Sequence, residues 1–164
     1  MSSPRNRMSG VAMVEFAIVV PLILMLFLGI TEMGHAFHQH NTLTKAVASG
    51  ARYLARGYAI LDAACATQGN WSAARATAEN LLIHGNTAGS GSPLLPGLDD
   101  SGATDIQVTH PQFSDASGSG CVIRMTVDTD YTPIFPGLFV GDNSLLNLPT
   151  FRLSAASEER YIGE

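Results

Sequence analysis

Apolar residues are distributed unevenly along the chain, and the densest run lies near its N-terminus. The segment from Val11 to Ile30 reads "VAMVEFAIVVPLILMLFLGI", and Glu15 is its only charged residue. At about 1.5 Å per residue, a helix of this length covers the roughly 30 Å hydrocarbon core of a bilayer. The run therefore predicts a transmembrane helix over 11–30. Pro21 is a candidate kink in it, because a proline inside a helix removes one backbone hydrogen bond.

A second apolar pattern follows this run, and its period is helical. Its members lie three or four residues apart, at Leu43, Ala46, Val47, Gly50, Ala51 and Leu54. This spacing places them on one face of a helix, and the small residues among them allow another element to approach closely. We therefore predict one continuous helix from Val11 to about Arg56. Its second half, over 31–57, forms a stalk that ends at Gly57.

From residue 58 onward, short helical and strand patterns alternate with loops. Two short helices are predicted, over 59–68 and 70–86, with Asn70 as the cap of the second and Gly85 as its end. Residues 85–105 are rich in Gly, Ser, Pro and Asp, which is typical of a surface loop.

Three strands are predicted by the alternation of apolar and polar residues, over 105–110, 121–131 and 150–161. In the middle strand one face is apolar and consists of Cys121, Ile123, Met125 and Val127. The whole pattern predicts an α+β fold, in which a long N-terminal transmembrane helix and short helices pack on a small three-stranded antiparallel sheet. Residues 58–164 form the exported domain of this fold.

The distribution of charge along the chain limits the partners that the protein can bind and predicts its orientation in a membrane. The net charge is −5, and the part from Tyr58 onward carries four arginines and twelve acidic residues. Such an acidic domain excludes nucleic acid as a partner, and it opposes contact between the distal part and an anionic bilayer. Arg5 and Arg7 precede the apolar run. The positive-inside rule therefore keeps the N-terminus in the cytoplasm and exports the rest.

The chain has two cysteines, Cys65 and Cys121, and both follow the apolar run. In an exported domain a lone pair is most simply one disulfide. It would close a loop of roughly 57 residues, which stabilises the fold by about 4 kcal/mol in the chain-entropy model. Such a bridge would join the first short helix to the sheet. In a cytosolic protein the same two residues would be buried free thiols, and their spacing alone does not decide between the two.

Candidate chemistry is sparse. The sequence has no phosphate-binding loop and no nucleophile-elbow motif, so no catalytic residue and no cofactor is predicted. Glu32, His35 and His38 come nearest to a metal site, but a spacing of three does not keep three side chains on one narrow face. We interpret them as a polar collar where the helix leaves the membrane, and we predict no metal. The apolar loop over 133–141, "PIFPGLFVG", is either a contact patch or a cap of the small core.

Glu15 distinguishes two ways in which an exported chain of this kind can be processed. In the first, an ordinary signal peptide is cut before Phe37, after the small residues of "GHA". In the second, the cut follows Gly10 and the apolar helix is retained. A charge in the core of a span costs roughly 2.5–3.5 kcal/mol, and a disposable signal gains nothing from it. After a cut at Gly10, the new ammonium group of Val11 lies one helical turn from Glu15 and can pair with a carboxylate of its own or a neighbouring subunit.

The segment "GVAMVEFAIVVPLIL" resembles the class III signal of type IV pilin precursors, which has a glycine, a cleavage point and a glutamate at the fifth mature position. With "GITEMGHAFHQHNTLTKAVASGARYLAR" added, residues 7–57 are similar to the TadE-like minor pilins, or pseudopilins, of the Tad (tight adherence), or Flp, pilus system. The proline in the span, the Glu-x-Gly after it and the "A-x-x-G-A-R" pattern carry this resemblance.

The resemblance implies a pilin-like fold, with a leader Met1–Gly10 that a prepilin peptidase removes at Gly10 and Val11. It implies that Glu15 registers one subunit against the next. The implied partners are the major pilin, other minor pilins and the inner-membrane assembly platform. The implied location is the inner membrane, with one span, a cytoplasmic N-terminus and a periplasmic domain that can join an extracellular pilus for surface adherence. The alternative is a secreted or periplasmic binding module cut before Phe37.

Overall fold

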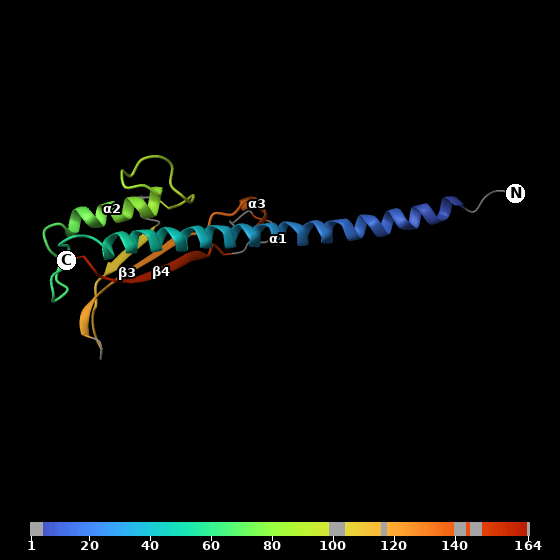
Figure 1. The fold of residues 1–164 in the computed structure, drawn as a ribbon. Coiled ribbons are helices and arrows are strands. Elements are labelled where there is room, and N and C mark those ends of the chain that lie inside the picture. Colours follow the sequence, from blue (N-terminus) through green and yellow to red (C-terminus); the bar gives the residue numbers. More distant parts are fainter. Residues whose placement is uncertain (1–4, 99–103, 116–117, 140–143, 145–148, 164) are drawn as a thin grey trace.

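The structure is a computed structural model that describes residues 5–98, 104–115, 118–139, 144 and 149–163. One long helix, α1 (Arg5–Ala55), runs along the whole molecule, and a small domain packs along its C-terminal half (Figure 1). Its 51 residues correspond to about 76 Å of helix. The predicted continuous helix is confirmed. It ends where expected, because Gly57 N–H donates to Leu54 O in a closing turn.

The predicted apolar stripe of α1 is buried against the domain. Leu43, Val47, Ala51 and Leu54 are each 0% exposed. At Gly50 the packing leaves no room for a side chain, because a Cβ there would lie 2.9 Å from Met125 Sδ and 3.1 Å from Ala78 O. A glycine at this position lets α1 approach a helix and the sheet at once.

Four strands form one antiparallel sheet. They are β1 (Asp105–Thr109), β2 (Gln112–Asp115), β3 (Gly118–Asp130) and β4 (Arg152–Arg160). The central strand is β3, with β4 along one side and β1 followed by β2 along the other. The α+β fold class is confirmed.

The sheet has one strand more than the sequence predicted. The first predicted strand does not end at His110 but resumes as β2, on the same side of β3. Pro111 lies at the interruption, and its carbonyl accepts a hydrogen bond from Val122 N–H at 3.0 Å. A proline has no N–H to donate to the ladder, so it divides this edge strand in two.

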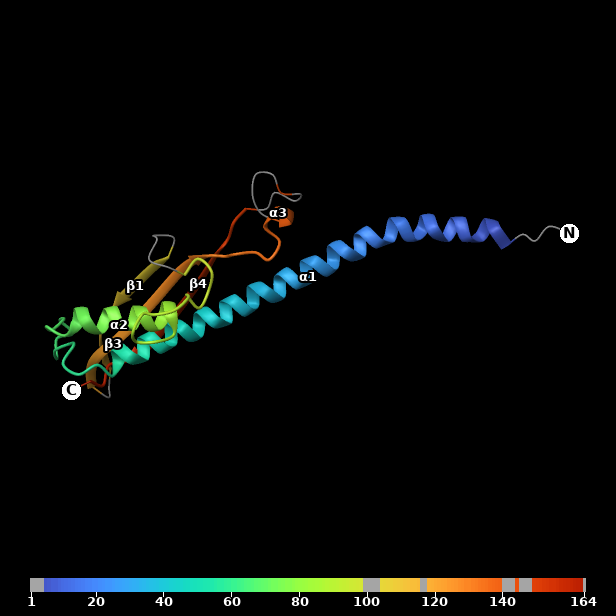
Figure 2. The same cartoon turned by 90° about the horizontal axis from the view of Figure 1, so that it is seen from above.

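The inner face of β3 supplies much of the core, as the alternation of apolar and polar residues in this strand predicted. Ile123, Met125 and Val127 are 0% exposed, and Cys121 is 4% exposed. They pack beneath α1 and the second helix, α2 (Trp71–His84), so that helices cover one face of the sheet (Figures 1 and 2).

The second predicted short helix is confirmed, together with the residues at its two ends. Gly85 follows α2 in a left-handed conformation with φ of 71°, and its N–H donates to Leu81 O. Asn70 is the N-cap residue of α2, as predicted, but it has helical backbone angles and its side chain makes no capping hydrogen bond. A third helix, α3 (Pro136–Phe139), is one turn long and lies in the connection between β3 and β4.

The predicted helix over 59–68 is wrong. This segment is a set of turns closed by one isolated bridge between Leu61 and Thr67. Asp62 Oδ1 accepts hydrogen bonds from the N–H groups of Ala64 and Ala66. An aspartate that binds nearby N–H groups in this way offers the backbone an alternative to the helix.

Candidate functional site

The apolar run is the largest exposed feature of the molecule. None of its most apolar window is buried, and Phe16 and Leu26 are 68% and 67% exposed. Its exposed large side chains are Val11, Met13, Val14, Phe16, Ile18, Val19, Leu22, Ile23, Leu24, Met25, Leu26, Phe27 and Ile30. A continuous apolar surface of this size is not stable in water, so it requires lipid or other protein around it. Within the described part of the chain, α1 is the helix that is long and apolar enough to cross a membrane.

Glu15 lies on this exposed surface. Among the residues that the structure describes, no hydrogen bond or ion pair reaches its carboxylate. Val11 is four residues earlier, so the two side chains share one face of α1. Gly10 adjoins them, and a Cβ at Gly10 would meet nothing within 4 Å. The three residues predicted from the sequence therefore lie together on one accessible stretch of helix.

Pro21 is the proline inside α1. Figure 2 shows that α1 is curved, with its blue, apolar part turned away from the direction of the stalk. A proline at this position frees the carbonyl of Ala17, four residues earlier, and is a known cause of helix bending. The kink at Pro21 itself stays a prediction.

The junction between α1 and the distal domain is built around a buried carboxylate. Glu32 is 8% exposed, and its Oε1 accepts hydrogen bonds from Tyr131 Oη at 2.5 Å and from Ile134 N–H at 3.0 Å. Its Oε2 is buried and has no hydrogen-bond partner among the described residues. Tyr131 and Ile134 belong to the connection that follows β3. One side chain of α1 therefore holds this connection in place.

A second polar side chain of α1 reinforces the junction two turns further on. Gln39 is 2% exposed, and its Nε2 donates to Thr132 O at 2.8 Å. The same Nε2 lies 2.7 Å from His35 Nε2, and the His35 ring meets the Tyr131 ring edge-on at 6.1 Å between centroids. Glu32, His35 and Gln39 therefore form one face of α1 that receives the chain after β3.

The interpretation of Glu32, His35 and His38 as a polar collar needs a correction. Glu32 and His35 face the distal domain, whereas His38 is exposed on another side of α1. The three do not converge, and the described residues contain no group of three His, Cys, Asp or Glu side chains placed to hold a metal. Glu32 is a tertiary contact rather than an exposed collar residue.

Burial raises the pKa of the Tyr131 hydroxyl well above its usual value. The hydrogen bond to Glu32 and the negative charge of Glu32 raise this pKa further, by smaller amounts. The folded protein thus binds this proton more tightly than the unfolded chain does. The resulting stability is fully present below the unfolded pKa of about 10, and it is lost as the pH rises toward the folded pKa.

We expect Tyr131→Phe to lower the free energy of unfolding by about 1–3 kcal/mol at neutral pH, because Glu32 loses a hydrogen-bond donor. The variant should also lose less stability than the wild type between neutral pH and about pH 11, because no phenol must ionise at position 131. Urea unfolding at the two pH values measures both effects. Tyr58→Phe is the matched control, because Tyr58 is 75% exposed. If the wild type and Tyr131→Phe lose equal amounts of stability between neutral pH and pH 11, the raised pKa of Tyr131 is not the cause of the alkaline loss.

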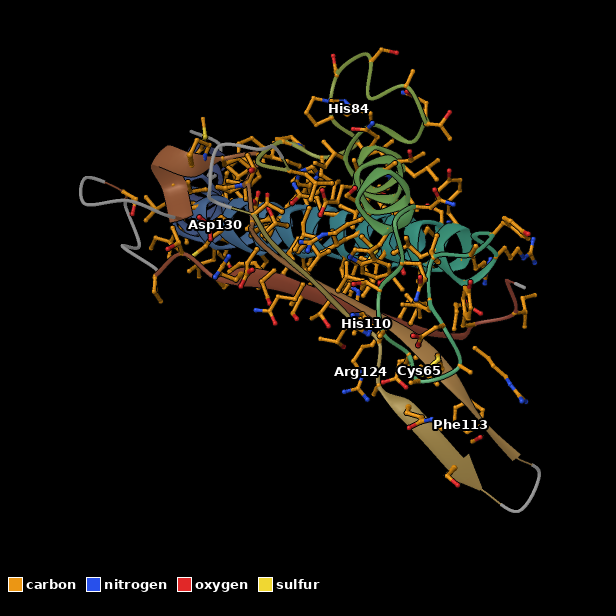
Figure 3. All side chains as sticks on the ribbon, turned by 90° about the vertical axis from the view of Figure 1, so that its left-hand side faces the viewer. Cys65, His84, His110, Phe113, Arg124 and Asp130 are labelled. Atoms are coloured by element: carbon orange, nitrogen blue, oxygen red, sulfur yellow. A yellow bond between two sulfur atoms is a disulfide. The ribbon has the colours of Figure 1, made fainter. Side chains whose placement is uncertain are left out.

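The two cysteines form a disulfide, with their Cα atoms 5.6 Å apart. Cys65 comes from the turns that follow Asp62 (Figure 3). Cys121 lies on the inner face of β3. The bridge therefore joins a turn to the sheet and not, as the sequence suggested, a helix to the sheet. Cys65 has a φ of 61°, a left-handed conformation that residues other than glycine seldom adopt.

These features define a class of protein: an α+β domain carried on one long helix whose first half is an exposed apolar rod with a single acid. Residues 10–52 match a family of proteins described as TadE-like. The resemblance predicted from the sequence is confirmed over this segment, which includes Gly10, Val11, Glu15 and Glu32. The match suggests a Tad pilus-related protein. No curated protein and no solved structure matches the chain.

Proposed function

We propose that this protein is a minor pilin, or pseudopilin, precursor that acts in the assembly of a Tad-type pilus and in surface adherence. A prepilin peptidase removes Met1–Gly10, and the new N-terminus at Val11 begins the mature helix. Residues 11–30 form the transmembrane or filament-core part, 31–57 the stalk and 58–164 the exported domain. The leader residues before Arg5 lie outside the described residues.

One observation carries this proposal. The exposed apolar rod continues without a break into the part of α1 that is docked on the domain. A rod that is rigidly joined to a folded domain can move that domain from the membrane into a helical assembly. Glu15 is the single charge on this rod, and its carboxylate is available to the Val11 ammonium group of a neighbouring subunit.

The proposed partners follow from this role. The prepilin peptidase must reach Gly10 at the cytoplasmic side, and the assembly platform of the inner membrane must receive the mature chain. The major pilin and other minor pilins contact the apolar rod. The arginines at positions 5 and 7 orient the precursor with its N-terminus in the cytoplasm and its domain in the periplasm.

The junction at Glu32 argues against the alternative of a secreted module. A signal-peptide cut before Phe37 would remove Glu32 and His35 from the domain. The Tyr131 hydroxyl and the Ile134 N–H would lose the acceptor that they share. Losing the partner of a buried polar group costs about 1–3 kcal/mol, so these contacts favour a mature chain that retains this part of α1.

The N-terminus of the mature protein tests the proposal. Intact-mass analysis of protein purified from its membrane is expected to show a chain that starts at Val11. A start at Phe37 would establish the secreted module instead.

Substitutions at two glycines, one at each alternative cleavage site, test where the chain is cut. A Cβ placed on either Gly10 or Gly34 would meet no atom within 4 Å outside the backbone of its own helix, so a larger side chain at either site disturbs no packing. We expect Gly10→Leu to block processing and to leave the full-length precursor in the membrane. Gly34→Leu should be processed normally, although it places a bulky residue at the −3 position of the alternative cut. The opposite pattern would contradict the proposed cleavage.

A further inference from the structure

The connection that follows β3 extends further toward the N-terminus of α1 than any strand does. Both views place α3 level with the part of α1 that comes directly after the apolar run (Figures 1 and 2). The described parts of this connection are 131–139, 144 and 149–151. The remainder of the apolar loop predicted over 133–141 lies outside the described residues.

Hydrogen bonds determine the height of this connection along α1. Ile134 N–H binds the carboxylate of Glu32, and Thr132 O binds the side chain of Gln39. Glu32 is two residues beyond Ile30, the end of the apolar run, which corresponds to about 3 Å along the helix. Helical side chains also lean toward the N-terminus, so the Glu32 carboxylate points back toward the run.

This height coincides with the headgroup region of a bilayer. If the apolar run fills the hydrocarbon core, the headgroups occupy roughly the next 5–8 Å on each side. Glu32 and the backbone of Ile134 then lie within that layer, on the exported side. The connection after β3 is thus held at the membrane surface by contacts within the protein.

The residues at this level have the chemistry of a lipid interface. Ile134 is 43% exposed, and Phe151, which stacks on Tyr131, is 46% exposed. On α1 itself, Met33 adjoins Glu32 and is 60% exposed. Aromatic and apolar side chains of this kind are favoured where hydrocarbon meets headgroups.

No acidic residue lies within 131–139, and Asp130, which precedes this stretch, pairs with Arg152. The sequence has no Asp or Glu between Glu32 and Asp62, and none between Asp130 and Asp142. The carboxylate of the junction, Glu32, is buried within the protein. The strongly acidic character of the distal domain therefore does not oppose membrane contact at this point.

We propose that the first part of the connection after β3, residues 131–139, is a second membrane contact, in which Ile134 and the partly exposed Leu138 of α3 enter the headgroup region of the exported leaflet. This inference rests on the proposed membrane span of α1. The two contacts together hold the distal domain at a defined tilt and height, with the Glu32 and Gln39 hydrogen bonds as the rigid link between them. With the span of α1 as the only contact, the domain would follow every change in the tilt of that helix.

Tryptophan fluorescence tests this contact in the full chain, reconstituted in vesicles of phosphatidylcholine and phosphatidylglycerol. The natural Trp71 is replaced by phenylalanine, and single tryptophans are placed at positions 134, 138 and 24. Ile134→Trp keeps the hydrogen bond to Glu32, because that bond uses the main-chain N–H. Brominated lipids with bromine at shallow or deep positions serve as quenchers.

The unmodified chain gives the distant control. Trp71 packs against the cluster that contains Leu54 and Ala55, about 33 Å along α1 from Glu32, so bromolipids should not quench it. Leu24→Trp lies within the apolar run and should be quenched best by deep bromine. We expect Ile134→Trp and Leu138→Trp to lose about half of their emission to shallow bromine and less to deep bromine, as befits interfacial residues.

The outcomes separate the two proposals. If position 24 is quenched while positions 134 and 138 are quenched no more than Trp71, the second contact is refuted and the membrane anchor stands. If position 24 is not quenched, the proposed span is refuted and the second contact with it. Formation of the Cys65–Cys121 disulfide in each variant confirms that it is folded.

Discussion

Glu15→Gln is expected to insert into the membrane at least as well as the wild-type chain and to fail in pilus assembly. Insertion should not suffer, because a carboxylate within a span costs up to about 2.5–3.5 kcal/mol and an amide costs less. Assembly should suffer, because a glutamine cannot form an ion pair with the Val11 ammonium group of the next subunit. The two effects have opposite signs.

The size of the assembly defect follows from the strength of such a pair. A hydrogen bond to a charged group contributes about 1.5–3 kcal/mol, which corresponds to roughly a tenfold to hundredfold weaker contact at each subunit. In a polymer this loss recurs at each place where the protein meets a neighbour. The pilus yield of cells that carry only the variant measures assembly. Carbonate extraction of their membranes measures insertion.

A neutral substitution beside Glu15 serves as the control. Val14 is 62% exposed on the same rod, and Val14→Ala removes apolar surface but no charge. It should insert and assemble almost normally. Normal pilus yield from Glu15→Gln would refute the proposed role of the carboxylate, whereas failed insertion would mean that the residue acts before assembly.

Removal of the disulfide by Cys65→Ala and Cys121→Ala is expected to lower the free energy of unfolding of the distal domain by about 4 kcal/mol. The two residues are 56 positions apart, and releasing so long a loop restores much conformational entropy to the unfolded chain. A domain of this size is stabilised by roughly 5–15 kcal/mol, so the loss is a large part of the total. Trp71 is partly buried in the same cluster as both cysteines, and its fluorescence reports the unfolding in urea.

The backbone of Cys65 provides a matched control for this experiment. Its φ of 61° is unfavourable for alanine but not for glycine. The pair Cys65→Gly with Cys121→Ala should therefore be less destabilised than the pair of alanines, by up to about 1–2 kcal/mol. If wild type under reducing conditions is as stable as under oxidising conditions, the bridge does not stabilise the domain as we expect.

Local patterns in the sequence were sufficient for the main elements. The apolar run, the stripe from Leu43 to Leu54 and the alternation in β3 each follow from a periodicity of 3.6 or 2 residues, which any stretch of chain shows by itself. The grouping of Gly10, Val11 and Glu15 is also local, because residues within one turn of a helix are neighbours.

Local patterns were misleading where a side chain or a proline overrode them. The apolar and small residues of 59–68 suggested a helix, but Asp62 binds the N–H groups of Ala64 and Ala66 and closes a turn instead. The alternation after Asp105 suggested one strand, but Pro111 interrupts its ladder. In both places a single residue changes which backbone hydrogen bonds can form.

The sequence by itself determined that this protein has an exposed apolar rod with one acid, a helical stalk and an α+β domain, because each depends on residues that are close along the chain. Only the tertiary structure decided how the domain is attached. Glu32 meets Tyr131 and Ile134, and Gln39 meets Thr132, across 93 to 102 positions of sequence. No periodicity encodes such pairs. They arise because the whole core packs β3 beneath α1, and this packing brings the end of the strand to the point where the helix leaves its apolar run.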